Sequence, residues 1–289
     1  MPSVKDLNRK IASLRNMQKV TRAMNMIATI KLRKLFGLQE PLGKFSEAVD
    51  GMAAEIAAAL GAHPHPVVSD SAVRRRGNIV VFTADKGLCG AHNNAVTKEL
   101  AVTIQDWKLR NEEAEVASFG IKGSNFCRRK EFSLFSQAEI SDRSLGTPQL
   151  KQMAGKLLER FLSREIQEVA VIYNRFVNTL QQETVVKTLL PIQAGRDDGA
   201  KRKGDVAIEP ETDVFAEAAA EQYLFYSLRI ALYNSYLSEH ASRMTAMENA
   251  THNSEDLISR YVTLQNRARQ AAITNEIIEI VSGIEAMNG

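Results

Sequence analysis

The sequence predicts a mixed α/β protein, with a long antiparallel coiled coil of N-terminal and C-terminal helices and an α/β domain inserted between them. Three observations support this fold. Residues 211–282 contain neither glycine nor proline, and apolar residues near both ends of the chain recur at steps of three and four. Between the ends, short β-branched runs alternate with helical patterns, as in domains built on a partly parallel sheet.

The first helix is expected to run from an N-cap at Ser3 to Phe36, because this stretch lacks glycine and proline. Its apolar residues step by three and four, with one shortened step that would overwind a coiled coil locally. They are Val4, Leu7, Ile11, Leu14, Met17, Val20, Met24 and Ile27. Gly37, Pro41, Gly43 and Gly51 are expected to weaken or kink the helix that follows, which ends at Gly61.

Basic residues are concentrated on this first helix. Between Lys5 and Lys34, nine lysines and arginines stand against one acid, Asp6, whereas the formal net charge of the whole chain is only +3. Such a concentration indicates either an acidic partner or a solvated helix face. A coiled-coil adaptor that binds nucleic acid is an alternative, although no aromatic residues interleave with the charges to stack on bases. A membrane-surface helix is disfavoured because tryptophan and phenylalanine are missing before Phe36.

The middle of the chain is expected to form a Rossmann-like α/β domain with a partly parallel sheet. The predicted strands are 78–83, 115–119, 168–176 and 184–190. The predicted helices are 93–107, 122–130 and 147–163. The polar segment 195–204 is expected to be an exposed loop. The expected division of the chain is residues 1–68 for the N-terminal helical segment, 69–210 for the α/β domain and 211–289 for the C-terminal helix.

The turn after the first strand, residues 84–90, is the one place to consider for phosphate binding, because glycines after a strand expose backbone N–H groups. Its spacing fits neither the dinucleotide-binding fingerprint nor the P-loop, so a tight turn is favoured. Cys89 has no base or acid placed by sequence to activate it, so we expect a small buried thiol. The sequence offers no convincing acid–base constellation. An α/β enzyme with a coiled-coil oligomerisation arm is a further alternative.

The C-terminal helix is expected to span roughly 100 Å at about 1.5 Å per residue, which is too long for the core of one compact domain. The expected seam residues are Leu257, Tyr261, Leu264, Ala268, Ala271 and Ile278. A second apolar stripe consists of Ile273, Ile277, Ile280 and Ile284. Because the two stripes overlap near the C-terminus, we expect that end to be enclosed on all sides by partners.

Composition limits the remaining options. The 289 residues are 44% hydrophobic, and no apolar run reaches the length of a membrane span. The N-terminus is expected to carry no secretory signal. The two cysteines, Cys89 and Cys127, then favour a reducing compartment. The five histidines are scattered, so no metal site is expected.

A segment near the C-terminus, residues 267–281, reads Arg-Ala-Arg-Gln-Ala-Ala-Ile-Thr-Asn-Glu-Ile-Ile-Glu-Ile-Val. Four further motifs lie at 19–26, at 83–90, at 176–179 with 189–191, and at 243–247 with 250–251 and 253. In this order along the chain, the five resemble motifs of the gamma subunit of F-type ATP synthases, and 267–281 is similar to the C-terminal signature of that family. The departures are single positions: Thr29-Ile30, His252 and Gly283-Ile284 stand where the family usually has Ala-Ser, Asp and Gly-Ala.

The resemblance implies a non-catalytic rotor shaft that couples proton flow to ATP synthesis or hydrolysis and needs no cofactor. It implies a ring of alpha and beta subunits, an epsilon subunit and a c-subunit ring as partners. It also implies a peripheral location on the cytoplasmic side of the bacterial inner membrane. The implied beta-subunit contacts are Met24, Arg269, Gln270, Thr274 and Glu276. Glu209 is the implied c-ring contact; alternatively it caps a helix opened by Pro210, and Thr274 bonds its own helix backbone.

Overall fold

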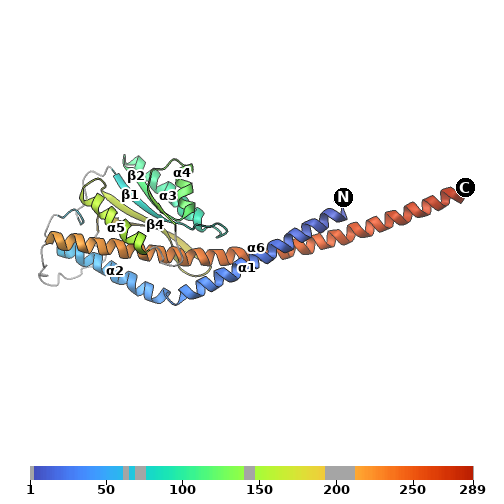
Figure 1. Ribbon diagram of the computed structural model, residues 1–289, viewed down its shortest axis with the longest axis horizontal. Helices are drawn as coiled ribbons and strands as arrows, with labels where there is room; N and C mark the ends of the chain where they lie inside the picture. Colours follow the sequence, from blue (N-terminus) through green and yellow to red (C-terminus); the bar gives the residue numbers. More distant parts are fainter. Residues whose placement is uncertain (1–2, 61–64, 69–75, 140–146, 193–211, 289) are drawn as a thin grey trace. The chain divides into compact units, whose positions relative to one another are not determined.

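The computed structural model describes residues 3–60, 65–68, 76–139, 147–192 and 212–288 (Figure 1). Its elements, in chain order, are α1 (Val4–Phe36), α2 (Gln39–Leu60), β1 (Arg76–Phe82), α3 (His92–Leu109), β2 (Glu113–Phe119), α4 (Ile121–Arg129), β3 (Leu134–Ala138), α5 (Thr147–Leu162), β4 (Glu168–Phe176), β5 (Gln182–Leu190) and α6 (Thr212–Asn288). The two long terminal helices and the α/β segment between them confirm the predicted fold class.

The chain divides into two compact units, and the boundary between them falls inside both α1 and α6. One unit runs from Ile30 to Arg243, and the other contains the residues up to Thr29 together with those from Met244 onward. The expected segments 1–68, 69–210 and 211–289 follow the order of the elements along the chain. The unit of residues 30–243 instead groups the last turns of α1, the whole of α2 and the first part of α6 with the sheet.

The sheet has five strands in the order β3-β2-β1-β4-β5. The pairs β3–β2, β2–β1 and β1–β4 are parallel, and β4–β5 is an antiparallel hairpin. Residues of α2, α5 and α6 pack on one face of the sheet, and residues of α3 and α4 pack on the other (Figure 1). Strands β1 and β4 lie in the middle and are buried on both faces, as their continuous apolar sequences predict.

Two local expectations need correction. Strand β3 was not predicted, because it is a short edge strand of half-exposed residues without a β-branched run. Helix α2 continues through Gly43 and Gly51, which are exposed, and Pro41 lies in its first turn. Proline is tolerated there because the first-turn N–H groups have no partner within the helix. The break between α1 and α2 is confined to residues 37–38.

The N-cap predicted at Ser3 is confirmed. The Ser3 hydroxyl accepts a hydrogen bond from the backbone N–H of Asp6 (3.2 Å) and donates one to the Asp6 carboxylate (2.7 Å). Segment 195–204 and Glu209 lie outside the described residues. Within the described part of the chain, every helix is too short or too polar to cross a membrane.

Candidate functional site

The N-terminal and C-terminal helices pair in an antiparallel direction. Going up α1, the partner positions on α6 fall steadily toward lower numbers, which confirms the predicted direction. The contacting pairs are Asn8–Gln265, Lys10–Tyr261, Gln18–Glu255, Thr21–Thr251 and Asn25–Met244.

Polar groups occupy part of the seam between these helices. The hydroxyls of Thr21 and Thr251 share a hydrogen bond of 2.8 Å, and the Asn25 amide donates to the backbone carbonyl of Met244 at 2.9 Å. Both bonds can form in only one register, because each fixes one residue of α1 opposite one residue of α6. Polar seam residues are a common way to specify the register of a coiled coil.

The seam of α6 follows the expected stripe only at Tyr261 and Ala268. Leu257 and Leu264 are 40% and 46% exposed, whereas Tyr261 is half-buried, so the prediction was wrong for the two leucines. The less exposed positions are Ser254, Ile258, Tyr261, Gln265 and Ala268, which also step by four and three. The prediction placed large apolar side chains in the seam and passed over Gln265. This polar side chain lies in the seam, where its amide donates a hydrogen bond to Asn8 (2.7 Å).

The last part of α6 is uncovered. Every position from 269 to 284 is exposed. The large apolar side chains there are 48–62% exposed: Ile273, Ile277, Ile278, Ile280, Val281 and Ile284. A contiguous apolar surface of this kind marks an interaction site in a soluble protein. The sequence predicted apolar side chains around this end, but it also placed Ala271 and Ile278 in the seam with the N-terminal helix, and both are exposed.

Four of the residues implied as beta-subunit contacts lie on this uncovered end: Arg269, Gln270, Thr274 and Glu276. The Thr274 hydroxyl donates to the Gln270 carbonyl at 2.9 Å, which confirms the alternative that Thr274 bonds its own helix backbone. Met24 is half-buried on α1, in the stretch that pairs with α6 near Met244. Met24 and the other four residues therefore lie at separate places along the coil, and their role as contacts stays a prediction.

The basic face of α1 is only partly neutralised within the chain. Arg22 pairs with Glu255, and its hydrogen bond holds the pKa of that carboxyl below the ordinary value. Arg9, Arg15 and Lys19 are exposed and form no ion pair with any carboxylate among the described residues. An acidic partner can therefore still reach these positive charges.

The turn at residues 84–90 packs against the start of α4. The backbone N–H groups at the start of α4 are already used: Ile121 donates to Asp85 Oδ1 (3.0 Å) and Gly123 to Thr83 Oγ1 (2.8 Å). Gly120 has a φ of +102°, and a Cβ there would lie 2.0 Å from the Thr83 carbonyl oxygen. Within the turn itself, Gly90 has a φ of +55°, a left-handed conformation that favours glycine and that agrees with the predicted tight turn.

Cys89 in this turn is a buried thiol, as predicted. Burial raises its pKa, and its Sγ accepts a hydrogen bond from the Asn93 amide at 3.1 Å. A thiol with a raised pKa is a poor nucleophile. Burial also lowers the pKa of the neighbouring His92 to about 3, so its imidazole is neutral near pH 7. Neither group is prepared for catalysis.

A buried ion pair lies beside the same turn. Arg243 Nη1 is 2.6 Å from Glu239 Oε1, and the two side chains are 10% and 11% exposed. Arg243 also lies 3.4 Å from the ring of His240 and reaches the Gly87 carbonyl at 3.5 Å. Burial raises the pKa of Glu239, and the positive charge of Arg243 opposes that rise. The pair links α6 to the turn after β1.

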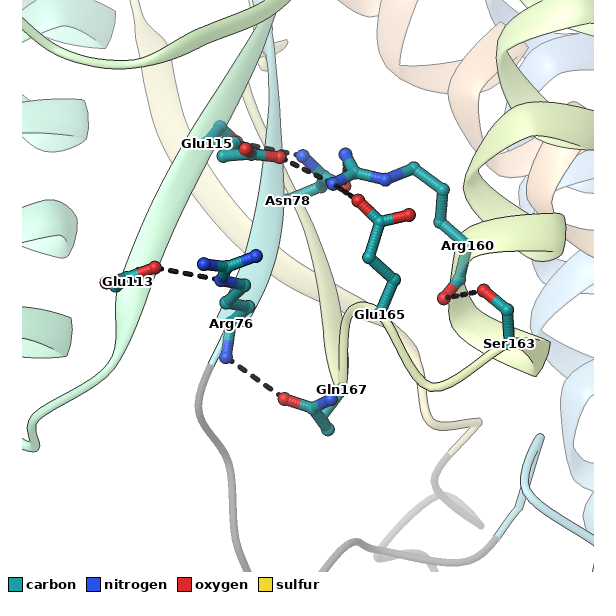
Figure 2. A network of polar contacts seen from close by, with 8 residues as sticks. All are labelled: Arg76, Asn78, Glu113, Glu115, Arg160, Ser163, Glu165 and Gln167. Carbon is teal, nitrogen blue, oxygen red and sulfur yellow. Dashed lines mark hydrogen bonds and ion pairs between the residues drawn. The ribbon is translucent and has the colours of Figure 1, made fainter.

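A second polar network joins the amino ends of β1 and β2 to α5 (Figure 2). The Arg160 guanidinium donates to Asn78 Oδ1 at 2.9 Å, pairs with Glu115 at 2.7 Å and also binds Glu165. Its other side covers the ring of Phe135 at 4.4 Å. Sequence reasoning missed this network because its members are far apart along the chain. Arg160 is saturated by partners from its own chain, so the network serves the fold.

No group of three or more histidine, cysteine, aspartate or glutamate side chains in the described ranges could hold a metal ion. The described residues thus form a coiled-coil shaft with an inserted α/β domain, and their main interaction surface is the uncovered end of α6. These features define a class of structural subunit that works by contact with other chains.

Comparison with known proteins identifies the family. The family profile described as "ATP synthase" matches residues 3–287. Curated proteins named "ATP synthase gamma chain" are 33% identical to this chain in Haemophilus influenzae strain PittGG and in Pelotomaculum thermopropionicum, covering 99% of this chain and 100% of each relative. The chain therefore belongs to the ATP synthase gamma chain family.

Solved structures share the fold. A chain from the central stalk and c-ring of Tetrahymena thermophila mitochondrial ATP synthase is 25% identical, with a TM-score of 0.60 over 80% of this chain and 99% of that chain. A chain from the OSCP/F1/c-ring structure of Euglena gracilis mitochondrial ATP synthase is 16% identical, with a TM-score of 0.69 over 98% of this chain and 94% of that chain. The second likeness concerns the fold alone.

Proposed function

We propose that this chain is the central rotor shaft of an ATP synthase, coupling proton flow through the membrane sector to ATP synthesis or hydrolysis at the beta subunits. The observation that carries the proposal is the uncovered apolar end of α6, residues 269–284, in a chain of the gamma family. A helix with apolar side chains on all sides needs a partner that surrounds it. A ring of alternating alpha and beta subunits has that geometry.

The mechanism follows from differential contact. A shaft built from two unlike helices presents a different surface to each beta subunit at each angle. A contact that binds one conformation of a subunit better than another shifts its conformational equilibrium. Rotation therefore changes the nucleotide affinity of each beta site in turn. The chain itself supplies no group to the chemistry, which takes place on the beta subunits.

We assign each of the other partners to a part of the chain. The exposed cations of α1, Arg9, Arg15 and Lys19, suit acidic segments of the beta subunits. Glu209 is proposed to meet polar loops of the c ring, and the epsilon subunit to lie beside the α/β domain. The complex is bound to the bacterial inner membrane, and this chain is peripheral to that membrane on its cytoplasmic side.

The polar contacts at the uncovered end are proposed to transmit force to the beta subunits. Arg269 and Gln270 are exposed in this chain, so they are free to bind a partner. Enclosed polar groups need hydrogen-bond partners, and each lost bond to a charged group weakens the contact by about 1.5–3 kcal/mol. We expect the Arg269→Ala/Gln270→Ala variant to lower coupled ATP synthesis by tenfold or more.

Reconstituted vesicles containing the whole complex test this proposal. The matched control is Arg260→Ala/Asn266→Ala, which removes two exposed polar side chains from the same helix outside the proposed contacts. The control should synthesise ATP normally, and both variants should keep the helical content of the wild type. Normal synthesis by the Arg269→Ala/Gln270→Ala variant would rule these contacts out. The nucleic-acid adaptor gains no support, since the full-length relatives are ATP synthase gamma chains.

A further inference from the structure

We infer that the α/β domain fixes the rotational setting of α6 through serine hydroxyls that bond to backbone carbonyls at the ends of strands β1 and β4. The Ser238 hydroxyl donates to the Asn174 carbonyl at 2.9 Å, and the Ser242 hydroxyl donates to the Cys89 carbonyl at 2.7 Å. A longer bond of 3.4 Å runs from the Ser235 hydroxyl to the Phe82 carbonyl. All of these residues belong to the compact unit that ends at Arg243.

The three serines lie on one face of the helix. Their spacing of three and four places them in line over two turns. Ser238 is fully buried, Ser235 is 2% exposed and Ser242 is half-buried. Their acceptors belong to β1, the turn that follows it, and β4, and β1 pairs directly with β4 in the centre of the sheet. The helix is therefore attached to the middle of the sheet.

Several hydroxyls further along α6 behave differently. Ser254, Thr263 and Thr274 each donate to the carbonyl four residues earlier in their own helix, at 2.7–3.1 Å. Such back-bonding is the common use of serine and threonine in a helix interior. The serines at 235, 238 and 242 instead donate to backbone carbonyls of the α/β domain.

The acceptors are themselves held in place. The Asn174 side chain donates to the His92 carbonyl at 2.9 Å and accepts from the Thr184 hydroxyl at 2.7 Å. The Cys89 carbonyl also accepts the backbone N–H of His92, at 3.2 Å. The serines therefore bind to a braced part of the domain.

Directional bonds do what apolar packing cannot. Hydrophobic contact is non-directional, so a helix packed only by apolar residues resists sliding and turning weakly. A hydrogen bond weakens steeply as its angle departs from linear, so three bonds on one face resist rotation of the helix about its axis. This inference rests on the proposed function in one respect: in a rotor, the same bonds would pass torque between the α/β domain and the shaft.

The first test uses the full chain alone and does not depend on the proposed function. The Ser238→Ala/Ser242→Ala variant should exchange the backbone N–H of His92 with deuterium faster than wild type. Each lost bond of about 1 kcal/mol corresponds to roughly fivefold faster local opening. The control Ser254→Ala/Thr263→Ala removes two hydroxyls bonded within their own helix and should leave this exchange unchanged. The Ser238→Ala/Ser242→Thr variant keeps a hydroxyl at position 242 and should recover most of the protection that the Ser238→Ala/Ser242→Ala variant loses. Equal exchange in the serine variant and the control would overturn the inference.

The second test uses the assembled complex. Thermal angular fluctuations of a bead fixed to the chain report the torsional stiffness of the rotor. The serine variant should show wider fluctuations than the control while still assembling and hydrolysing ATP. Wild-type fluctuations in an assembled, rotating serine variant would refute the torsional role and leave the proposed function intact. A wild-type chain that never enters the complex would instead refute the proposed function.

Discussion

Removal of Arg243 should expose the energetic cost of burying Glu239. The two side chains are 10% and 11% exposed and 2.6 Å apart, so Arg243→Met leaves a carboxylate buried without its counter-ion. Breaking a buried pair by removing one partner costs about 3–5 kcal/mol of unfolding free energy, whereas removing both partners costs much less. We therefore expect Arg243→Met to be less stable than Glu239→Gln/Arg243→Met.

The loss should depend on pH with a defined sign. Burial raises the pKa of Glu239 above its ordinary value of 4.5, so the folded state binds this proton more tightly than the unfolded state. The stability from that proton is full below the ordinary pKa and is lost as pH rises through the raised pKa. Arg243 and the nearby Lys31 oppose the rise, while Asp85 adds to it. Without Arg243 the pKa rises further, so the variant should lose more stability at pH 8 than at pH 5.

Urea unfolding of the full chain at both pH values measures these free energies. Arg22→Met provides the matched control, because Arg22 and its partner Glu255 have side chains 62% and 41% exposed, and solvent screens such a pair. The control should lose far less stability than Arg243→Met. The reasoning would be refuted if Arg243→Met lost less than about 1 kcal/mol, or if the double variant were as unstable as the single one.

Three further predictions concern other parts of the chain. Gly120→Ala should cost more than about 3 kcal/mol, since its Cβ would lie 2.0 Å from the Thr83 carbonyl oxygen, whereas the control Gly51→Ala should be neutral or stabilising in thermal unfolding. Cys89 and Cys127 should resist iodoacetamide at pH 8 in the native chain and react in urea, because burial raises both pKa values, that of Cys127 to about 11; rapid native labelling seen by mass spectrometry would contradict their burial. Glu209→Lys should loosen rotor assembly and uncouple hydrolysis from proton pumping with little loss of chain stability, while a variant that couples normally but melts earlier would show that this carboxylate only caps a helix.

The sequence predicted the elements whose signal is local and periodic. The long C-terminal helix, the N-cap at Ser3 and strands β4 and β5 follow from residue types within one or two turns or one strand. Edge strand β3 has only five residues and half-exposed side chains, so its existence depends on pairing with β2, which a local pattern does not contain.

Contacts between distant residues were harder to predict. The residues of α6 that form the seam with α1 include polar pairs such as Gln265–Asn8, and the apolar pattern of the sequence carries no information about such pairs. The buried pair Glu239–Arg243 and the Arg160 network arise where elements far apart in the sequence meet. By contrast, the uncovered apolar end of α6 was predictable, because both of its apolar stripes lie within a single helix.

Observation of rotation in the assembled complex is the most direct test of the rotor assignment. A Leu109→Cys variant offers a selective attachment point for a bead, since Leu109 is 76% exposed and both native thiols are buried. With the alpha–beta ring immobilised, addition of ATP should turn the bead in one direction with three pauses per revolution. A bead that stays at a fixed angle while the complex hydrolyses ATP at its full rate would contradict the assignment of this chain as the shaft.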